Sequence, residues 1–270
     1  MNGVRVAGAV AEPSLAGIKL EQLVVRFGGL TAVNGLTLEA RPGRVTALLG
    51  PNGAGKTTAF NVCSGLLRPT EGTVYFDGQD VTSLSPQVRA RRGLGRTFQK
   101  MELFDHATVW DNVSMGREAA MAGSTPWKQI FATRREKRIL TEATQQALDL
   151  CGIADLAQRR PAELSTGQRR LVELARVTAG GFSMLLLDEP SSGLDKAETQ
   201  AFGQVLRDLV QTTGCGILIV EHDMSLVMEL SDYVYVMEFG TPIFEGTPDE
   251  VRRSPEVRAA YLGTEGESDA

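Results

Sequence analysis

The apolar positions of the chain follow two periods, one typical of strands and one typical of helices. Apolar and polar residues alternate over 18–26 and again over 33–40, with Gly28 and Gly29 between the two segments, which predicts a β-hairpin. Largely apolar runs predict three buried strands, at 44–49, 184–187 and 215–220. Shorter strands are expected at 73–76 and 94–98, and a closing hairpin at 234–237 and 242–244.

Helix signals separate these strands. Helices are predicted at 57–64, 85–92, from 108 onward, at 134–150, at 195–213 and from 247 to near 262. Three of them open with residues that resemble capping boxes: Thr108 with Asp111, Asp195 with Glu198, and Thr247 with Glu250. Strand signals disappear over 100–178. We therefore predict an α/β core that carries an N-terminal antiparallel β subdomain and an α-helical subdomain inserted over 100–178.

Composition narrows the class of protein. The 270 residues include 42% hydrophobic and 23% charged residues, which is ordinary for a globular protein of one large or two smaller domains. A formal charge of −5 and a pI near 5.3 argue against a mainly electrostatic nucleic-acid binder, which is usually basic. No apolar run approaches the roughly 20 residues that span a bilayer, so any membrane role is expected to act through a partner.

The ends of the chain and its cysteines add to this picture. Residues 1–15 lack the charged and apolar regions of a signal peptide and are expected to form a flexible extension. One domain is predicted over 16–263, followed by a polar, disordered tail at 264–270. Cys63, Cys151 and Cys215 are far apart and odd in number, which favours a reduced, cytosolic compartment.

The segment 50–58 matches the phosphate-loop pattern GxxxxGK[ST] between a predicted strand and a predicted helix. It reads Gly50-Pro51-Asn52-Gly53-Ala54-Gly55-Lys56-Thr57-Thr58. Glycines let the backbone bend so that successive N–H groups converge on phosphate oxygens at a helix N-terminus. In this pattern the lysine, Lys56, reaches the β- and γ-phosphates and the hydroxyl of Thr57 binds Mg²⁺. The sequence therefore predicts a nucleotide site.

Candidate catalytic groups follow two other predicted strands. Asp188 and Glu189 end the strand at 184–187, where Asp188 is expected to hold the metal and Glu189 to orient or deprotonate the attacking water. Two solvated acids after a strand are the alternative. His222 follows the strand at 215–220, and ligands gather at the carboxyl ends of parallel strands. A polar histidine that caps the next helix is the alternative for this residue.

Two further features, the segment 164–168 and Phe27, indicate a function only when they are considered together with the phosphate loop. The segment 164–168, which reads Leu-Ser-Thr-Gly-Gln, predicts a helix start with Ser165 or Thr166 as N-cap. Its free N–H groups suit a γ-phosphate, and two molecules arranged head to tail would each offer them to the other. Phe27 ends the first predicted strand, where it either stacks on adenine or belongs to the core.

Over 18–263 the chain resembles the nucleotide-binding subunit of an ATP-binding cassette (ABC) transporter, with its motifs in the family's order. The resemblance implies a P-loop NTPase (RecA-like) core and an ATPase that uses ATP and Mg²⁺. It makes Gln99, in RTFQ, the Q-loop glutamine, 164–168 the signature motif and 191–195 the D-loop. It also makes His222 the switch histidine and places Phe27 at the adenine-stacking position.

The family's functional residues then fall on named positions of this chain. The catalytic residues are expected to be Glu189, His222 and Gln99, and the metal ligands Thr57, Gln99 and Asp188. Nucleotide is expected to contact Phe27, Val33, Asn52, Gly53, Ala54, Gly55, Lys56, Thr57, Thr58 and, from the signature motif, Ser165, Gly167 and Gln168. One residue departs from the usual LSGGQ signature, because Thr166 replaces its first glycine and adds a Cβ.

The resemblance also implies an assembly. Two ATPase subunits, identical or different, sandwich two ATP molecules, each between one phosphate loop and the other subunit's signature helix. The helical subdomain and Gln99 form the groove for a permease coupling helix. The partners are thus a second ATPase subunit, integral membrane permease subunits and, through them, a substrate-binding protein, with no nucleic acid. The chain is expected to lie peripherally on the cytoplasmic face of the cell membrane.

A narrower resemblance concerns cargo. RFGGLTAVNGL, GRTFQ, EHDMSLVM and AYLG are similar to the branched-chain amino acid uptake ATPases, although importers of urea, amides and other hydrophobic amino acids share this style of ATPase. The alternative is a soluble cassette ATPase that acts on nucleic acid or ribosomes, but these commonly carry two cassettes or long coiled-coil insertions. The basic stretch 128–138 is either a solvated helix face or a contact for anionic lipid headgroups.

Overall fold

The structure is a computed structural model that describes residues 16–97, 103–122 and 133–265. In this part of the chain a six-stranded sheet has the order β10-β9-β3-β8-β7-β6. Its strands are β3 (Val45–Leu49), β6 (Leu94–Arg96), β7 (Met184–Asp188), β8 (Gly216–Glu221), β9 (Tyr233–Glu238) and β10 (Thr241–Gly246). All neighbours pair in parallel except β9 and β10, which form the predicted closing hairpin.

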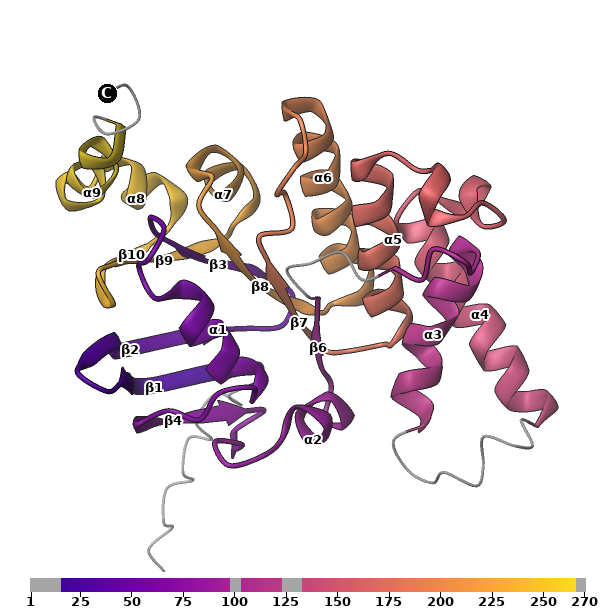
Figure 1. Ribbon diagram of the computed structural model, residues 1–270, viewed down its shortest axis with the longest axis horizontal. Helices are drawn as coiled ribbons and strands as arrows, with labels where there is room; N and C mark the ends of the chain where they lie inside the picture. The colour runs from indigo at the N-terminus through magenta and orange to yellow at the C-terminus, as the bar shows by residue number, and fades with distance from the viewer. Residues whose placement is uncertain (1–15, 98–102, 123–132, 266–270) are drawn as a thin grey trace, which may run out of the picture.

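A second sheet of four strands is antiparallel, with the order β2-β1-β4-β5. Its strands are β1 (Ile18–Phe27), β2 (Leu30–Ala40), β4 (Glu71–Phe76) and β5 (Gln79–Asp80). Helix α1 (Lys56–Ser64) lies between this sheet and the six-stranded one (Figure 1). Phe60 on α1 belongs to an apolar cluster that contains Leu20 of one sheet and Leu186 of the other. The two sheets therefore share a core through α1.

Helices make up the rest of the fold. They are α2 (Pro86–Arg91), α3 (Val109–Ala122), α4 (Arg134–Leu150), α5 (Thr166–Ala179), α6 (Lys196–Thr213), α7 (Met224–Leu230), α8 (Pro248–Arg253) and α9 (Pro255–Glu265). Between β6 and β7 the described residues form helices and no strand, as predicted for the inserted subdomain. Helices α3, α4 and α5 pack together beside the large sheet (Figure 1). The mixed α/β fold class predicted from the sequence is confirmed.

Helix bounds agree with the capping signals. Asp195 and Glu198 form the predicted capping box at the start of α6, and Thr247 and Glu250 form the one at α8. Thr108 likewise exchanges hydrogen bonds with Asp111 before α3. The last predicted helix differs from the structure in two ways, because Ser254 divides it into α8 and α9, and α9 continues to Glu265 rather than ending near 262. Glycine weakens a helix by only about 1 kcal/mol relative to alanine, so Gly263 does not end α9.

The thiol groups of the three cysteines are buried and form no disulfide. Burial raises the pKa of Cys63 and Cys151 to about 12 and also raises the pKa of Cys215. These cysteines act as small apolar residues in the core. Among the described residues, no helix combines the length and the apolar character that crossing a membrane requires.

Arg89, on α2, joins the end of α1 to the segment between β5 and α2. It is 1% exposed, and its guanidinium donates hydrogen bonds to the carbonyls of Val62 and Cys63 at the end of α1. It also donates to the carbonyls of Thr82 and Leu84. A cation at a helix C-terminus is favoured by the helix dipole. Arg89 therefore fixes the far end of the helix that follows the phosphate loop.

Replacing Arg89 with methionine is expected to lower the free energy of unfolding by about 3 kcal/mol, because buried carbonyls lose their donors. Urea unfolding followed by circular dichroism measures the change. Arg92→Met is the matched control, since Arg92 is exposed on the same helix end and its side chain bonds only to Gln79 in the described contacts. Equal losses in the two variants would show that the buried contacts of Arg89 contribute no stability.

Candidate functional site

The predicted phosphate loop lies between β3 and α1, and close packing explains two of its glycines. A Cβ on Gly50 would stand 2.3 Å from the carbonyl oxygen of Met237. Gly55 has φ of 92°, and a Cβ there would stand 2.3 Å from the carbonyl oxygen of Ala32. The turn between β9 and β10 supports the loop, because Gly240 N–H donates to the carbonyl of Ala54 at 3.2 Å. The loop is thus held between β2 and the β9–β10 turn.

The start of α1 is suited to an anion. Its N-cap, Gly55, has no side chain to accept from the first N–H groups, and the first turn carries no acidic residue. Lys56 is 5% exposed, and its Nζ donates to the carbonyls of Gly50 at 2.6 Å and Pro51 at 2.9 Å. Burial lowers the pKa of Lys56, against the opposing effect of Glu189, Glu221 and Asp188. Thr57 is exposed beside it.

Asp188 ends β7 with only 1% of its surface exposed. Neither carboxylate oxygen accepts a hydrogen bond within the described chain, and the nearest cation is Arg96, whose Nη2 lies 3.5 Å from Oδ2. Burial raises the pKa of Asp188. Mg²⁺ prefers oxygen ligands and is usually held by one or two carboxylates together with phosphates and water. The unsatisfied carboxylate of Asp188 and the hydroxyl of Thr57 fit such a metal.

The described residues contain no cluster of three or more His, Cys, Asp or Glu side chains suited to a metal. A metal at Asp188 would therefore take most of its ligands from phosphate oxygens and water, as Mg²⁺ does in phosphoryl-transfer sites. Gln99, the other predicted metal ligand and a predicted catalytic residue, lies outside the described residues.

Glu189 and His222 lie close together at the same edge of the large sheet. Asp188 pairs with Val220 across β7 and β8, so the residues just beyond these strands meet. Nδ1 of His222 lies 3.8 Å from Oε1 of Glu189. Glu189 has φ of 43°, a left-handed conformation that costs about 1 to 3 kcal/mol in a residue with a side chain and concentrates at functional sites. Both side chains reach solvent, with Glu189 18% and His222 48% exposed.

A further carboxylate, to which sequence reasoning assigned no role, lies behind this pair. Glu221 ends β8 and is 0% exposed. Its Oε1 accepts hydrogen bonds from Ser191 N–H at 3.1 Å and from Ser191 Oγ at 2.6 Å, and its Oε2 accepts from His222 N–H at 3.3 Å. Burial raises the pKa of Glu221, and the Ser191 bonds oppose this effect. A signal was present, because Glu221 follows an apolar strand just as Asp188 does.

Ser165 is the N-cap of α5. It forms a capping box with Gln168, in which Ser165 Oγ accepts from Gln168 N–H at 3.2 Å and Gln168 Oε1 accepts from Ser165 N–H at 3.1 Å. A Cβ on Gly167 would stand 2.7 Å from Oε1 of Glu198, a side chain of α6. The helix start that the sequence predicted is confirmed, with Ser165 rather than Thr166 as its cap.

The start of α5 contacts the segment 191–195. Cγ2 of Thr166 lies 3.5 Å from the place of a Cβ on Gly193. Arg170, 7% exposed, donates to the carbonyl of Ser192 at 3.3 Å and pairs with Glu173 at 3.1 Å. Arg170 is a second residue that sequence reasoning missed. Figure 1 shows α5 and α1 apart, with β7 and β8 between them. The start of α5 therefore does not complete the phosphate site of its own chain.

Two predicted nucleotide contacts have different environments. Phe27 is 50% exposed at the end of β1, so the alternative that it is a core residue is wrong. Val33 is 0% exposed, and its Cγ2 lies 3.4 Å from the place of a Cβ on Gly55. Val33 thus packs beneath the phosphate loop, and a role in binding nucleotide stays a prediction for both residues.

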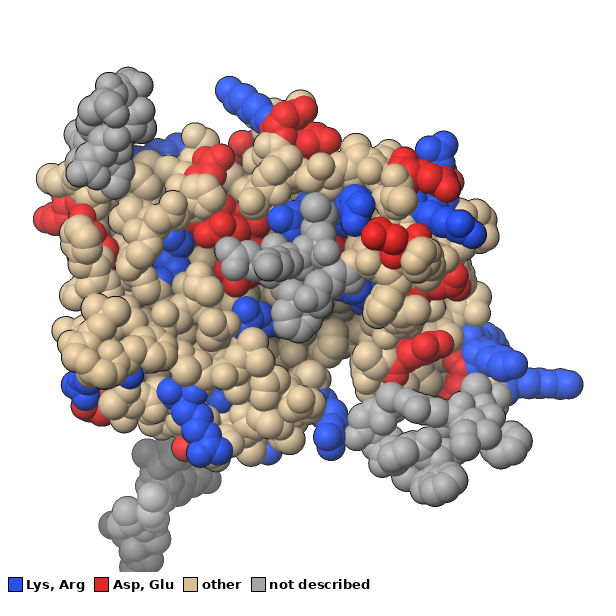
Figure 2. Space-filling model, viewed as in Figure 1, with Lys and Arg blue, Asp and Glu red and all other residues tan. Residues whose placement is uncertain are grey.

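The surface carries a groove between the helical subdomain and the large sheet. The groove has a volume of about 440 Å³ and is lined by Leu103, Phe104, Met115, Phe182 and, among its polar residues, Arg176. Phe104 is 56% exposed there. On the face drawn in Figure 2, lysines and arginines of the described residues are interspersed with acidic side chains. An apolar groove on a surface of mixed charge suits a protein partner better than a nucleic acid.

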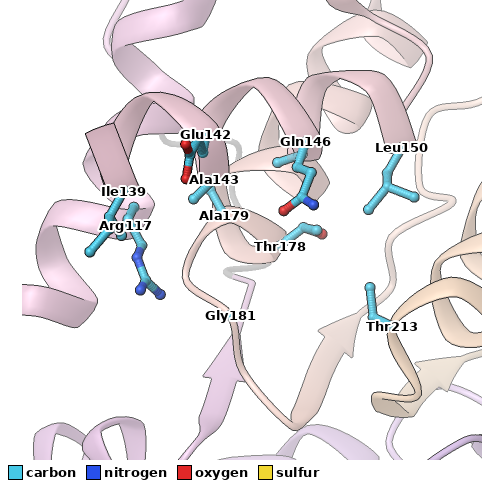
Figure 3. Close-up of a pocket in the computed structure, with 11 residues that line it drawn as sticks. Arg117, Ile139, Glu142, Ala143, Gln146, Leu150, Thr178, Ala179, Gly181 and Thr213 are labelled. Carbon is cyan, nitrogen blue, oxygen red and sulfur yellow. The ribbon is translucent and has the colours of Figure 1, made fainter. Parts of the chain in front are cut away.

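A second hollow, of about 340 Å³, is formed by α4, the C-terminal end of α5 and parts of α3 and α6. Figure 3 shows Arg117 at one end, Leu150 at the other, and Gln146 and Thr178 between them. Its lining includes no residue of the phosphate loop and neither Asp188, Glu189 nor His222. We assign this hollow no part in nucleotide chemistry.

Two family models match the chain. The model described as ABC transporter matches residues 33–192, and the model described as branched-chain amino acid ATP-binding cassette transporter matches residues 241–267. The first match includes the phosphate loop, the start of α5 and the pair Asp188 and Glu189.

Individual proteins are similar over nearly the full length. The chain is 38% identical to the high-affinity branched-chain amino acid transport ATP-binding protein LivG of Escherichia coli (strain K12), over 91% of this chain and 97% of that protein. It is 37% identical to BraF of Pseudomonas aeruginosa, which bears the same description, over the same shares. A crystal structure of an ATP-binding cassette of an ABC transporter, in its ADP conformation, matches with a TM-score of 0.78 and 31% identity, covering 91% of this chain and 98% of that one.

Proposed function

The chain belongs to the ABC transporter family as an ATP-binding, ATP-hydrolysing subunit, and from this premise we propose that it drives the import of branched-chain or other hydrophobic amino acids through a membrane permease. The names of the similar proteins LivG and BraF, and the match at residues 241–267, support this cargo. The main support for the mechanism is that four side chains lie close together at one edge of the large sheet: Lys56, Asp188, Glu189 and His222.

Each of these residues has a role that its surroundings suit. The N–H groups of the phosphate loop and of the start of α1 bind the phosphates, and Lys56 exchanges its carbonyl partners for β- and γ-phosphate oxygens. Asp188 and Thr57 hold Mg²⁺, which when bound neutralises charge that develops on the phosphates. Gln99, which follows β6 in the sequence, is a further ligand of Mg²⁺ and a further catalytic residue.

Glu189 orients the attacking water and accepts its proton, because its carboxylate reaches solvent beside the buried Asp188. His222, 3.8 Å from Glu189, stabilises the charge on the γ-phosphate side of the reaction. Phe27 offers an exposed aromatic face for the adenine. Hydrolysis therefore uses groups from β7, β8 and the phosphate loop of one chain.

The site is completed by a second subunit. Ser165, Gly167 and Gln168 begin α5 on the far side of β7 and β8 from the phosphate loop of the same chain, as Figure 1 shows. The start of α5 has unpaired N–H groups beyond those that its capping box satisfies, and these attract phosphate. In a head-to-tail pair, each subunit presents this helix start to the ATP of the other. The Cγ2 of Thr166 lies on the side of Gly193 of its own chain, 3.5 Å from the place of a Cβ there, and Ser165 and Gly167 are the residues that approach the phosphate.

The apolar groove beside β6 is the docking site for the permease. It lies between the helical subdomain and the sheet that carries the catalytic residues, so that movement of either changes its shape. The exposed ring of Phe104 supplies apolar surface for a helix of the permease. The chain then lies peripherally on the cytoplasmic face of the membrane, and a substrate-binding protein delivers cargo on the other side.

Phe104→Asp is expected to lower recovery of the permease at least about 10-fold when the tagged chain is purified from detergent-solubilised membranes, because a buried, unpaired charge opposes docking. Leu66→Asp is the matched control. Leu66 is 55% exposed against 56% for Phe104, but it lies on the turn after α1 and not in the groove. ATP binding by both variants should equal that of the unmodified chain. Recovery of ribosomes or DNA in place of a permease would contradict the transporter proposal.

A further inference from the structure

Glu221 joins two parts of the site that are separate in the sequence. One oxygen, Oε1, accepts both hydrogen bonds of Ser191, at 3.1 Å from N–H and 2.6 Å from Oγ. The other, Oε2, accepts from His222 N–H at 3.3 Å and lies 3.9 Å from His222 Nδ1. One carboxylate thus contacts the segment 191–195 with one oxygen and His222 with the other.

Burying the carboxylate of Glu221 costs free energy. Glu221 is 0% exposed and follows Ile217, Leu218, Ile219 and Val220, all of them core residues. A buried charge is usually no more stabilising than an apolar residue of similar volume, even when it is well paired. The hydrogen bonds from Ser191 and His222 offset the cost of removing the carboxylate from water. They do not make Glu221 more stabilising than an apolar residue at this position. Glu221 lies between His222 and the segment 191–195 and bonds to both.

The segment 191–195 also carries the contacts to α5. Arg170 on α5 donates to the carbonyl of Ser192, and Cγ2 of Thr166 lies 3.5 Å from the place of a Cβ on Gly193. The same segment is tied to the catalytic strand, because Ser192 N–H donates to the carbonyl of Glu189 at 3.1 Å. A continuous set of contacts runs from the start of α5 through the segment 191–195 and Glu221 to His222.

We propose that Glu221 is a positioning residue whose carboxylate holds His222 and the segment 191–195 at one point, so that the placement of His222 depends on the placement of this segment. The proposal rests on the role proposed above for His222. It adds that Glu221 positions the His222 side chain. Any shift of the segment 191–195, including one imposed by a neighbouring subunit, reaches His222 through the two oxygens of a single side chain.

The test is a double-mutant cycle between Ser191 and His222 in the assembled transporter, read as kcat and KM for ATP. Ser191→Ala is expected to lower kcat about 10-fold with KM within about 2-fold, since misplacement of about 1 Å costs up to about 10² in rate. His222→Ala is expected to lower kcat about 10²-fold. The double variant should be no slower than His222→Ala by more than about 2-fold, because both changes act through one group.

Two outcomes would overturn the proposal, and they are distinguishable. If the two effects multiply to about 10³-fold, Ser191 does not act through His222, and the link through Glu221 is wrong while the role of His222 stands. If His222→Ala alone leaves kcat unchanged, the role proposed for His222 is wrong, and the link falls with it.

Glu221→Gln gives a second, independent measurement. The amide has the same shape, but its NH₂ group must face either Ser191 or His222, so one set of contacts is lost. We expect kcat to fall about 10-fold with KM for ATP within about 2-fold and a nearly unchanged melting temperature. Glu238→Gln, at the end of β9 on the same sheet, is the matched control and should leave kcat unchanged. A Glu221→Gln variant with the kcat of this control would also overturn the proposal.

Discussion

Replacing Glu189 with glutamine is expected to lower ATP turnover at least about 10²-fold while ATP binding persists. Glutamine keeps the length of the side chain but cannot take a proton from water. The backbone penalty is also unchanged, because both residues carry the same branching at φ of 43°. A loss of turnover would therefore reflect the missing carboxylate and not a change in the backbone conformation at position 189.

Steady-state phosphate release and titration with a fluorescent ATP analogue measure the two parts of this prediction. The Glu238→Gln variant again serves as control, since it makes the same chemical change at the end of β9. Near-normal hydrolysis by Glu189→Gln would remove Glu189 from the role of general base. Loss of nucleotide binding would mean that the carboxylate supports the phosphate loop itself.

The second large effect is expected at Gly55. Gly55→Ala should weaken ATP binding at least about 10²-fold, because losing one or two hydrogen bonds to a charged phosphate costs about 3 kcal/mol. The added Cβ would stand 2.3 Å from the carbonyl oxygen of Ala32, where no flexible side chain is available to move aside. Either β2 or the loop must shift, and the N–H groups at the start of α1 shift with the loop.

Gly43→Ala is the matched control for the backbone part of this effect. Gly43 has φ of 69° against 92° for Gly55, but a Cβ there meets nothing within 4 Å. It is expected to lose about 1 kcal/mol of stability and to keep its affinity for ATP. Calorimetric titration with ATP separates the two variants. Equal affinities would contradict the argument that close packing against Ala32 shapes the loop.

Local signals in the sequence predicted most of the fold. Capping boxes at Asp195 and Thr247 placed the starts of α6 and α8, because capping depends on residues only three positions apart. The apolar run at 184–187 likewise placed β7 and the two acids that follow it. The end of α9 was less accurate, since the residues beyond Tyr261 carry no strong stop signal.

Several contacts that the sequence did not reveal are long-range. Ser191 and Glu221 are 30 residues apart, Arg170 and Ser192 are 22 apart, and Arg89 reaches carbonyls 26 and 27 residues away. No periodic pattern encodes such pairs, because they depend on how strands and helices are placed in space. The predicted site residues Glu189 and His222 came from motifs, but their 3.8 Å separation required the parallel pairing of β7 and β8.

The burial of Cys63, Cys151 and Cys215 has a practical consequence for studying the assembled transporter. Thiol reagents attack the thiolate. Burial raises the pKa of Cys63 and Cys151 to about 12 and also raises the pKa of Cys215, so these side chains present little thiolate near neutral pH. A single cysteine introduced on the surface of the native chain should therefore react alone, without removal of the natural ones. Spectroscopic labels at the phosphate loop of one subunit and the start of α5 in another would then test whether two subunits pair head to tail in solution.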